Sequence, residues 1–419
     1  MTPARPRHSG RRVTRLLSHP ATWVGLIACV LVAACVRVNV HGPRAAAGVR
    51  IATYNTSLYD EAAGGLVRRL ESGDPGARNI AAVLQRTRPD IVLLNEFDYD
   101  AAGRAVDLFQ RDYLAIAQAG GGAPLRYAYR YLAPVNTGVP SGLDLDRNGT
   151  VGGAGRERGN DAWGYGLHPG QYGMLVLSRY PIDTGAVRTF QLLRWSAMPG
   201  VEPPRIQATG EPWYRPEVWS QLRLSSKSHW DVPIRTPAGV IHLLAAHPTP
   251  PVFDGPENRN GLRNRDEIRL WAEYLGTGDK SWLCDDRGHC GGLPSDAHFV
   301  IAGDYNADPS DGDGVPGAIA QLLEHPRVDA RVIPRSAGAT ERALQRGIAR
   351  RGDIAAHTGD FGPNSGTLRL DYVLPSRGLQ VVGSGVFWPR ADEPGADIVA
   401  ASDHHLVWID IAPATRASR

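Results

Sequence analysis

The sequence predicts an α/β fold, and three consecutive segments predict it most directly. Residues 49–55 alternate apolar and other side chains, which is typical of a half-buried strand. Residues 77–88 place Ile80, Val83 and Leu84 on one face and end before a proline, as expected of an amphipathic helix. Residues 91–96 are a short apolar run typical of a buried strand. Strand, helix and strand in close order predict a β-α-β unit.

The remaining segments continue the alternation. We expect strands over residues 172–181, 240–247, 299–303, 368–375 and 402–411 and helices over residues 266–275 and 316–325. Residues 119–170 and 334–366 are Gly-rich or polar, and we expect loops there. Residues 191–220 are rich in Pro and Trp, which predicts a surface excursion. Four tryptophans are expected in the core, with a pocket wall or lipid contact as the alternatives: Trp195, Trp213, Trp219 and Trp230.

The first 37 residues differ in composition from the rest. They hold six arginines and no acidic residue, and a largely apolar run over residues 21–36 follows the Arg-rich start. This order is typical of an export segment, and the run is short for a span of ~20 residues. We therefore expect an export signal or a membrane or lipid anchor at 1–37. A short linker at 38–48, one domain at 49–413 and a tail at 414–419 are expected to follow.

The end of the apolar run leaves three alternatives open. Val32-Ala33-Ala34-Cys35 resembles a bacterial lipobox, in which Cys35 would be lipidated and become the mature N-terminus. An uncleaved signal anchor and simple cleavage near Ala34 are the other two, and twin-arginine export fits weakly. Each alternative predicts an exported protein that is attached to the cell envelope or secreted. In the anchored versions the N-terminal segment contacts the membrane.

The charge of the body disfavours a generic polyanion binder. Of the 46 basic residues, 40 lie outside the N-terminal segment, against 43 acidic residues. A nucleic-acid-binding protein would be expected to have a basic face or stripe. Nucleic acid is therefore not a favoured partner. It stays possible, because a bound metal could supply positive charge locally.

Two further motifs lie in the expected loops. Cys284 and Cys290 are the two cysteines of the body, and in an exported protein they predict a local disulfide. Two thiols with His289 would give too few ligands for a closed zinc site. Asp144, Asp146 and Asn148 begin like a calcium-binding loop, but position twelve is glycine where the full pattern needs glutamate. An ordinary Asp/Asn/Gly turn is the alternative.

Polar residues stand at the ends of the expected strands. The apolar run 299–303 ends in Asp304-Tyr305-Asn306, and on a strand Asp304 and Asn306 would point the same way. Each residue alone has a structural explanation as a turn or a solvated strand end. Together they predict one crevice, because ligand sites of α/β proteins form at strand ends. The set is Asn55, Glu96, His247, Asp304, Asn306, Asp371, Asp403 and His404.

The order of these motifs resembles the endonuclease/exonuclease/phosphatase superfamily, over about residues 49–413. The motifs are Thr53-Tyr54-Asn55, Asn95-Glu96, Ser178-Arg179-Tyr180-Pro181, His247, Gly303-Asp304-Tyr305-Asn306, Arg369-Leu370-Asp371-Tyr372 and Ser402-Asp403-His404. The resemblance implies a four-layer sandwich, in which two packed mixed β-sheets are flanked by helices. It also implies hydrolysis of a phosphodiester or phosphomonoester with Mg²⁺ or Mn²⁺, in which a metal-activated water attacks. Tyr305 replaces a common Phe and Asn95 a common Gln, and neither departure is expected to touch the chemistry.

The resemblance also assigns roles to residues of this chain. It implies Glu96 as the main metal ligand, with Asn55 nearby and Asp403 beside the metal. Carboxylate and amide oxygens suit Mg²⁺ better than zinc, which agrees with this assignment.

The catalytic roles follow in the same way. Asp304 and Asn306 are expected to orient the attacking water and the phosphate. His404 is implied beside the scissile phosphate, held by Asp371, and His247 matches the second histidine of the deoxyribonuclease branch.

The substrate stays open among a nucleic acid, a sphingomyelin-like lipid and a small phosphoester, because loops decide specificity in such folds. A non-catalytic phosphate-ligand-binding protein is a second class, but such a protein would be expected to lose some of these polar residues. A cell-envelope structural protein would explain the N-terminus but not the site. We expect a monomer.

Overall fold

The computed structural model describes residues 48–413. The predicted export segment at 1–37 and its Cys35, nearly all of the linker and the tail at 414–419 lie outside the described residues. Between residues 48 and 413, no helix combines the length and the apolar composition that crossing a membrane requires.

The first sheet has six strands in the order β12-β13-β1-β2-β4-β3. The predicted β-α-β unit is present in it, because β1 and β2 pair in parallel and α2 connects them. The bounds are β1 (Val49–Leu58), β2 (Ile91–Phe97), β3 (Tyr129–Tyr131), β4 (Met174–Ser178), β12 (Val381–Val386) and β13 (Val407–Ile411).

The second sheet has five strands in the order β11-β8-β7-β6-β5. β7 and β8 run parallel, whereas β11 pairs with β8 in the opposite direction. The bounds are β5 (Arg188–Thr189), β6 (His229–Thr236), β7 (Gly239–Ala246), β8 (His298–Asp304) and β11 (Asp371–Pro375), and a separate two-stranded pair is formed by β9 (Gly359–Asp360) and β10 (Thr367–Leu368).

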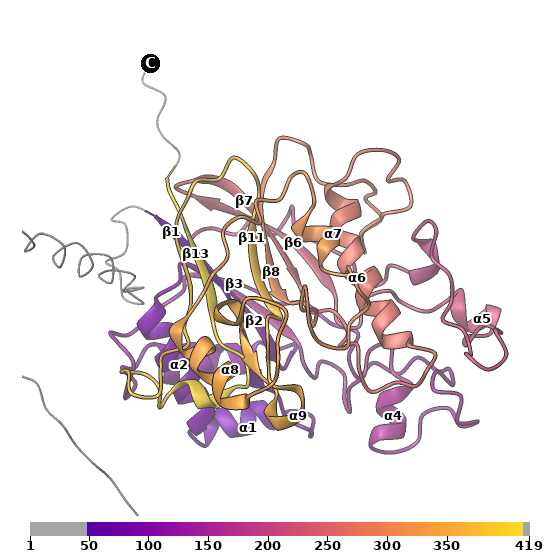
Figure 1. Cartoon of the computed structure of the whole chain (residues 1–419), viewed down its shortest axis with the longest axis horizontal. Helices are drawn as coiled ribbons and strands as arrows, with labels where there is room; N and C mark the ends of the chain where they lie inside the picture. Colours follow the sequence, from indigo (N-terminus) through magenta and orange to yellow (C-terminus); the bar gives the residue numbers. More distant parts are fainter. Residues whose placement is uncertain (1–47, 414–419) are drawn as a thin grey trace, which may run out of the picture. The chain divides into compact units, whose positions relative to one another are not determined.

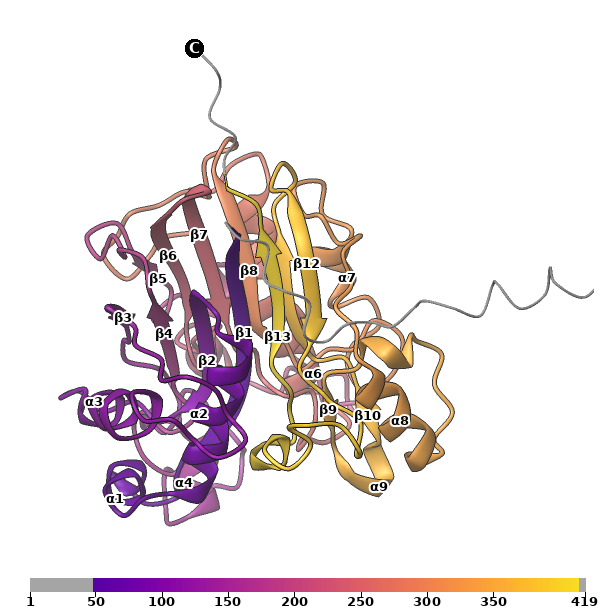
Figure 2. The ribbon, with the colours of Figure 1, turned by 90° about the vertical axis from the view of Figure 1, so that its left-hand side faces the viewer.

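The two sheets pack face to face with helices outside them, as Figures 1 and 2 show. A buried apolar cluster lies between the sheets, where Ile51 and Leu93 of the first meet Leu243 and Val300 of the second. A second cluster lies between the first sheet and its helices, and a third lies between the second sheet and its helices. This is the predicted four-layer sandwich of two mixed sheets, and the prediction is confirmed.

The helices of the outer layers belong to different parts of the chain. Those on the first sheet are α1 (Gly65–Glu71), α2 (Pro75–Thr87) and α3 (Arg104–Leu108), which a π-helical turn over Phe109–Leu114 extends. Those on the second are α6 (Arg259–Leu275) and α7 (Ala320–Leu323). Shorter helices lie in the connections: α4 (Arg156–Asn160), α5 (Pro216–Trp219), α8 (Ala337–Arg346), α9 (Gly362–Ser365) and the 3₁₀ turns Trp195–Ala197, Ile354–Ala356 and Val399–Ala401.

Several expected element bounds are wrong for physical reasons. α6 begins at Arg259 and not near residue 266, because its buried face carries polar residues such as Asn264, which donates to two backbone carbonyls. The last strand begins at Val407, since residues 402–406 form the turn that carries the Asp-His pair. The helix expected over 316–325 is one turn, and α3, α4, α8 and α9 form where loops or no helix was expected.

The four tryptophans between residues 191 and 230 pack into the core. Trp195 and Trp230 are fully buried, and Trp213 and Trp219 pack partly buried against the cluster under α6. None of the four lines the large cavity described below. The expectation of a core role therefore holds, and the pocket-wall alternative does not.

Cys284 and Cys290 form a disulfide with their Cα atoms 3.9 Å apart. The bridge closes a short loop, so we expect that replacing both cysteines with Ser lowers the free energy of unfolding by about 2 kcal/mol on the loop-entropy scale. Urea denaturation of the unreduced wild type and of the double variant measures this difference. Neither cysteine lines the large cavity, so the substitution should leave the cavity unchanged. Equal denaturation midpoints would contradict the prediction.

Candidate active site

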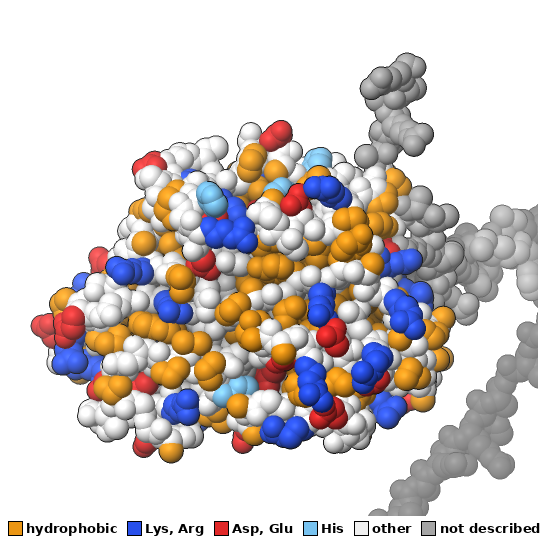
Figure 3. Space-filling model, turned by 180° about the vertical axis from the view of Figure 1, so that it is seen from behind, with side chains coloured by type: hydrophobic (Ala, Val, Ile, Leu, Met, Phe, Trp, Pro, Cys, Tyr) orange, Lys and Arg blue, Asp and Glu red, His pale blue; other side chains and the backbone are white. Residues whose placement is uncertain are grey.

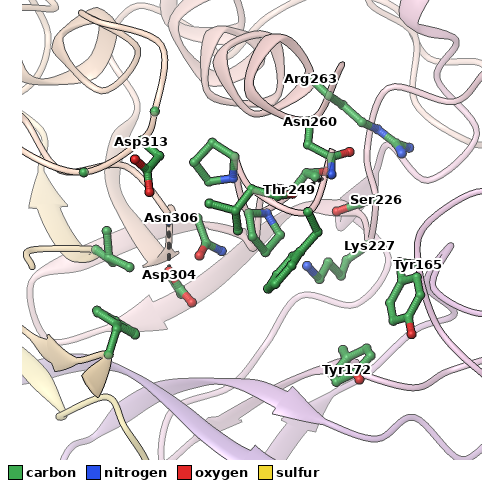
Figure 4. Close-up of a pocket in the computed structure, with 18 of the residues that line it drawn as sticks. Tyr165, Tyr172, Ser226, Lys227, Thr249, Asn260, Arg263, Asp304, Asn306 and Asp313 are labelled. Atoms are coloured by element: carbon green, nitrogen blue, oxygen red, sulfur yellow. Dashed lines mark hydrogen bonds between the residues drawn. The ribbon is translucent and has the colours of Figure 1, made fainter. Parts of the chain in front are cut away.

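A cavity of about 900 Å³ opens where polar ends of the two sheets meet. Figure 4 shows Asp304 and Asn306 on one side of it and Lys227, Ser226 and Arg263 on the other. Five of the eight predicted site residues line the cavity: Glu96, Asp304, Asn306, Asp403 and His404. The other three, Asn55, His247 and Asp371, are buried, and each contacts Asp304 or His404.

The strand directions explain why these residues meet. β1, β2, β7 and β8 contribute their carboxyl ends. β13 and β11 run antiparallel to their neighbours, so they contribute the residues at or before their amino ends, His404 and Asp371. Asp371 is thereby paired in register with Asp304. The prediction that Asp371 lies inside a strand is corrected, because it is the first residue of β11.

Asp304 and Asn306 come together through a turn and not through strand alternation. Asp304 is the last residue of β8, and Asn306 has a left-handed φ of 50°. The amide N–H of Asn306 donates to Asp304 Oδ1 at 2.9 Å, and its Nδ2 donates to the carbonyl of Pro248 at 3.2 Å. Gly303 is required before them, because a Cβ there would lie 2.0 Å from the carbonyl oxygen of Ala246.

Asp304 is the most densely contacted carboxylate of the site. Asn55 Nδ2 donates to Asp304 Oδ2 at 3.0 Å, and His247 Nε2 and His404 Nε2 lie 3.4 and 3.5 Å from the same oxygen. Burial and the carboxylate of Asp371 together raise the pKa of Asp304 to about 6, against the positive charge of His404. A carboxylate with a pKa in this range can accept a proton near neutral pH.

His404 is held by a buried carboxylate. Its Nδ1 and Asp371 Oδ2 are 2.8 Å apart. Burial alone would lower the pKa of His404, but the carboxylates of Asp371 and Asp304 outweigh it and raise that pKa well above its usual value. With Nδ1 bound to Asp371, Nε2 faces Asp304 and can donate a hydrogen bond.

Sequence reasoning missed the residue that fixes Asp371. The Thr358 hydroxyl donates to Asp371 Oδ2 at 2.7 Å and accepts the backbone N–H groups of Leu370 and Asp371 at 3.0 Å each. Thr358 lies in a segment expected to be a polar loop, with no pattern around it that marks a site. Only the folded chain brings it against β11.

Asn95 was also underestimated. Its side chain is fully buried and links the sheets: Oδ1 accepts the backbone N–H of Asp304 at 3.3 Å, and Nδ2 donates to the carbonyl of Ala246 at 3.4 Å. The sequence indicated only a replacement for a common Gln. In the fold Asn95 positions the backbone of the central aspartate.

Glu96 is a partly buried carboxylate in a strained conformation. Its φ is 55°, a value uncommon for a residue with a long side chain. Burial raises the pKa of Glu96 to about 7, while the charges of His404 and Lys227 and a hydrogen bond from Asn55 oppose this shift. A nearby divalent cation would favour the ionised form.

The donor set of the cavity fits a hard cation. Glu96 and the exposed Asp403 both line the cavity and offer carboxylate oxygens. The oxygens and ring nitrogen of Asp304, Asp371 and His404 lie within 4.8 Å of one another, a spacing that could hold a metal ion. In the part of the chain that the structure describes, Glu96 and Asp403 do not belong to such a three-residue group. The structure thus brings two of the three predicted ligands, Glu96 and Asp403, to the wall of one cavity, whereas the third, Asn55, is buried.

Lys227 is a cation of the cavity that sequence reasoning missed. It is 5% exposed and lies just before β6. Burial lowers its pKa, while the carboxylates of Glu267, Glu96 and Asp304 oppose this effect. Lys227 and Lys280 are the only lysines in the sequence, beside 44 arginines, which is the signal that could have drawn attention to it.

The predicted calcium loop keeps its predicted residues together, and Asp161 joins them. Side-chain oxygens of Asp144, Asp146 and Asp161 lie within 4.8 Å of one another, and the backbone N–H of Asn148 donates to Asp144 Oδ1 at 3.1 Å and to Asp146 Oδ1 at 3.2 Å. Asp161 Oδ1 and Oδ2 accept the backbone N–H groups of Leu145 and Gly152 at 2.7 Å each. These bonds suffice to explain an ordinary turn, and calcium binding stays a prediction.

Several solved structures are similar to this chain at low sequence identity. One is an endonuclease/exonuclease/phosphatase from Beutenbergia cavernae (19% identity, TM-score 0.47, covering 88% of this chain and 72% of that one). Another is an endonuclease/exonuclease/phosphatase family protein from Leptotrichia buccalis (14% identity, TM-score 0.44, covering 87% of this chain and 99% of that one). A third is sphingomyelinase C from Streptomyces griseocarneus (17% identity, TM-score 0.40, covering 87% of this chain and 99% of that one). A search of curated proteins gave no match.

A family model gives the clearest comparison. The model described as "Endonuclease/Exonuclease/phosphatase family" matches residues 52–404, from the first strand to the histidine of the Asp-His pair. This span covers most of the chain and every predicted site residue. The chain therefore belongs to the endonuclease/exonuclease/phosphatase family.

Proposed function

We propose that this protein is an exported, metal-dependent phosphoesterase. The main support for the proposal is the set of side chains and backbone groups that contact Asp304. The side chain of Asn55, the backbone of Asn306 and the His404–Asp371 pair converge on this carboxylate at the wall of a cavity. Family members are typically metal-dependent hydrolases of phosphoesters, and the retention of the whole polar set disfavours a non-catalytic binding protein.

The metal we propose is Mg²⁺ or Mn²⁺, held by Glu96 with Asn55 and Asp403. A divalent cation would neutralise the anionic phosphate and stabilise the leaving oxygen. The oxygen donors named here suit such a cation better than zinc.

The other side chains of the site have separate proposed roles in the reaction. Asp304, oriented by Asn55 and Asn306, would accept the proton of the attacking water. Protonated His404 would donate from Nε2 to a phosphoryl oxygen while Asp371 holds its Nδ1. The Nδ2 group of Asn306, on the cavity wall, offers a second donor to the phosphate.

The class of phosphoester is the finer part of the proposal. A cavity of this volume suits one small substrate or the end group of a larger one. On the face seen in Figure 3, Lys and Arg side chains are interspersed with acidic and apolar ones and form no continuous stripe among the described residues. The near-neutral balance of 40 basic and 43 acidic residues outside the N-terminal segment favours a small phosphoester or a lipid headgroup over nucleic acid, with a secreted nuclease as the alternative.

Export and membrane attachment rest on the sequence of residues 1–37 alone. Cell fractionation and the intact mass of the mature protein test this part of the proposal. A full-length cytosolic protein would contradict export, and a mature N-terminus other than Cys35 would contradict only lipidation.

The test of the function is hydrolysis of two simple substrates. We expect the purified protein with Mg²⁺ to hydrolyse bis-p-nitrophenyl phosphate if it is a diesterase and p-nitrophenyl phosphate if it is a monoesterase. A panel of nucleic acid, sphingomyelin and small phosphoesters then ranks natural substrate classes by kcat/KM. No hydrolysis of any of them, by folded protein with Mg²⁺ or Mn²⁺, would overturn the proposal.

His247→Ala should cost less activity than loss of His404, of the order of ten-fold in kcat/KM. Burial lowers the pKa of His247 well below its usual value, helped by the charges of Lys227 and His404, so its ring is neutral at pH 7. It lies 3.4 Å from Asp304 and does not line the cavity. It can therefore position Asp304 but not contact the phosphate, and a loss as large as that of His404→Ala would contradict this role. Kinetics with bis-p-nitrophenyl phosphate compare the two variants.

A further inference from the structure

Lys227 is an unusual residue for the place it occupies. Lysine is almost never fully buried without a partner, yet this side chain is 5% exposed. Its ammonium makes no hydrogen bond and no ion pair within 4.0 Å with any residue from 48 to 413. The negative charges that act on it, from Glu267, Glu96 and Asp304, act from a greater distance.

The cavity wall holds Lys227 in a fixed position. The carboxylate of Glu267, fully buried in α6, accepts the backbone N–H of Ser226 at 2.7 Å and that of Thr249 at 2.6 Å. One carboxylate thus ties the segment before β6 to the segment after β7. Figure 4 shows the result, with the ammonium of Lys227 directed toward Asp304 and Asn306 from the opposite side of the cavity.

Two hydroxyl groups beside Lys227 also lack partners. Ser226 Oγ and Thr249 Oγ1 are buried, and neither makes a hydrogen bond within residues 48–413, although both residues line the cavity. Unsatisfied buried polar groups are rare and costly. An ammonium without a partner in a polar cavity wall matches the chemistry of an anionic oxygen ligand.

We propose that Lys227 is a substrate-binding residue whose ammonium binds a non-bridging oxygen of the phosphoryl group, opposite Asn306. The identity of the anion rests on the proposed function. A lysine ammonium is a compact point charge, whereas the guanidinium of the more common arginine is a larger planar group. Ser226 and Thr249 lie in the same wall and provide its polar surroundings.

A purely structural role is the competing explanation. Lys227 would then only balance the charge of Glu267, and no ligand would reach its ammonium. The two roles differ in whether an anion from solution competes for the ammonium.

The composition of the chain offers a direct test with wild-type protein. Pyridoxal 5′-phosphate carries a phosphate and an aldehyde, which condenses with a lysine amine with loss of water. Borohydride then reduces the imine to a stable secondary amine. Because the sequence holds only Lys227 and Lys280, peptide mass mapping reads both sites. Lys280 is the internal control, since it pairs with Glu273 and does not line the cavity.

We expect pyridoxal 5′-phosphate to modify Lys227, and we expect inorganic phosphate to reduce this modification at least five-fold, both with Mg²⁺ and with chelator. Phosphate should leave the modification of Lys280 unchanged. An unmodified Lys227, or modification insensitive to phosphate, would overturn the proposal.

Kinetics provide the second measurement. Lys227→Met should lower kcat/KM for bis-p-nitrophenyl phosphate roughly 100-fold, as does loss of one donor at a developing charge. Lys227→Arg should recover part of this loss, and Lys280→Met should match the wild type. Wild-type activity of folded Lys227→Met would overturn the proposal. The labelling needs no turnover: phosphate-sensitive labelling without hydrolysis would refute the proposed enzyme but keep the binding site, and hydrolysis without such labelling would refute only Lys227.

Discussion

His404→Ala is expected to lower kcat by ~10⁴-fold while the protein stays folded. The imidazole is the group best placed to donate to a phosphoryl oxygen, because Asp371 occupies its Nδ1 and its Nε2 lies 3.5 Å from Asp304. The side chain lines the cavity, and its ring also packs edge to face against Phe361, so the folded state of the variant has to be measured. Near-wild-type activity of the folded variant would refute the catalytic assignment of the whole site.

Asp371→Asn is the companion variant that isolates the ion pair. The amide keeps the shape but removes the charge that outweighs burial and raises the pKa of His404. The protonated ring is present below its pKa and is lost as pH rises through it. Wild-type kcat/KM should therefore decline only well above pH 6.5, whereas the decline in Asp371→Asn should begin at lower pH. The loss of activity could approach ~10⁴-fold, by analogy with a triad aspartate in another enzyme class.

Circular dichroism and thermal unfolding control for folding in both variants. Thr358→Val is a matched variant, because it removes only the hydroxyl that donates to Asp371. Its loss of activity should be smaller than that of Asp371→Asn. An unchanged pH profile in Asp371→Asn would show that Asp371 does not set the charge of His404.

Local patterns in the sequence predicted the alternation of strands and helices, whereas the four-layer arrangement was implied by the resemblance to the family. The β-α-β unit at the start is visible in apolar spacing, which depends on neighbours a few residues apart. α6 was only half predicted, because its first turns bury Asn264 through hydrogen bonds to the backbone of Thr249 and Tyr305, distant in sequence. An apolar periodicity cannot report a face that is buried by polar contacts.

The residues of the candidate site also fall into those that the sequence predicted and those that it did not. Glu96, Asp304 and His404 stand at strand ends in motifs that the sequence displays, and the fold brings them to one cavity. Thr358 and Lys227 have no such motif, and their roles arise from segments that meet only in the folded chain. The left-handed backbone of Asn306 was also beyond sequence reasoning, since a strand pattern gives no sign of where the strand turns.

Removal of divalent cations is expected to abolish activity entirely, with recovery on addition of Mg²⁺ or Mn²⁺. Glu96 and Asp304 face the cavity with pKa values raised by burial, so ionised carboxylates there need positive charge. His404 and Lys227 supply part of it, but an anionic phosphate adds negative charge to the same space. Without a divalent cation the attack on the phosphate therefore lacks its main electrostatic support.

The measurement is hydrolysis of bis-p-nitrophenyl phosphate by chelator-treated protein during titration with Mg²⁺ and, separately, Mn²⁺. Glu96→Gln should need a higher Mg²⁺ concentration for half-maximal activity, because an amide binds the cation more weakly than a carboxylate. Asp144→Asn is the matched control in the other acidic group and should leave the Mg²⁺ titration unchanged. Thermal unfolding provides a second readout, since a ligand present at 100 times its Kd stabilises the folded state by about 2.7 kcal/mol. Full activity of metal-free protein in chelator would refute the metal-dependent mechanism, whereas an unchanged Mg²⁺ requirement in Glu96→Gln would refute only the assignment of Glu96.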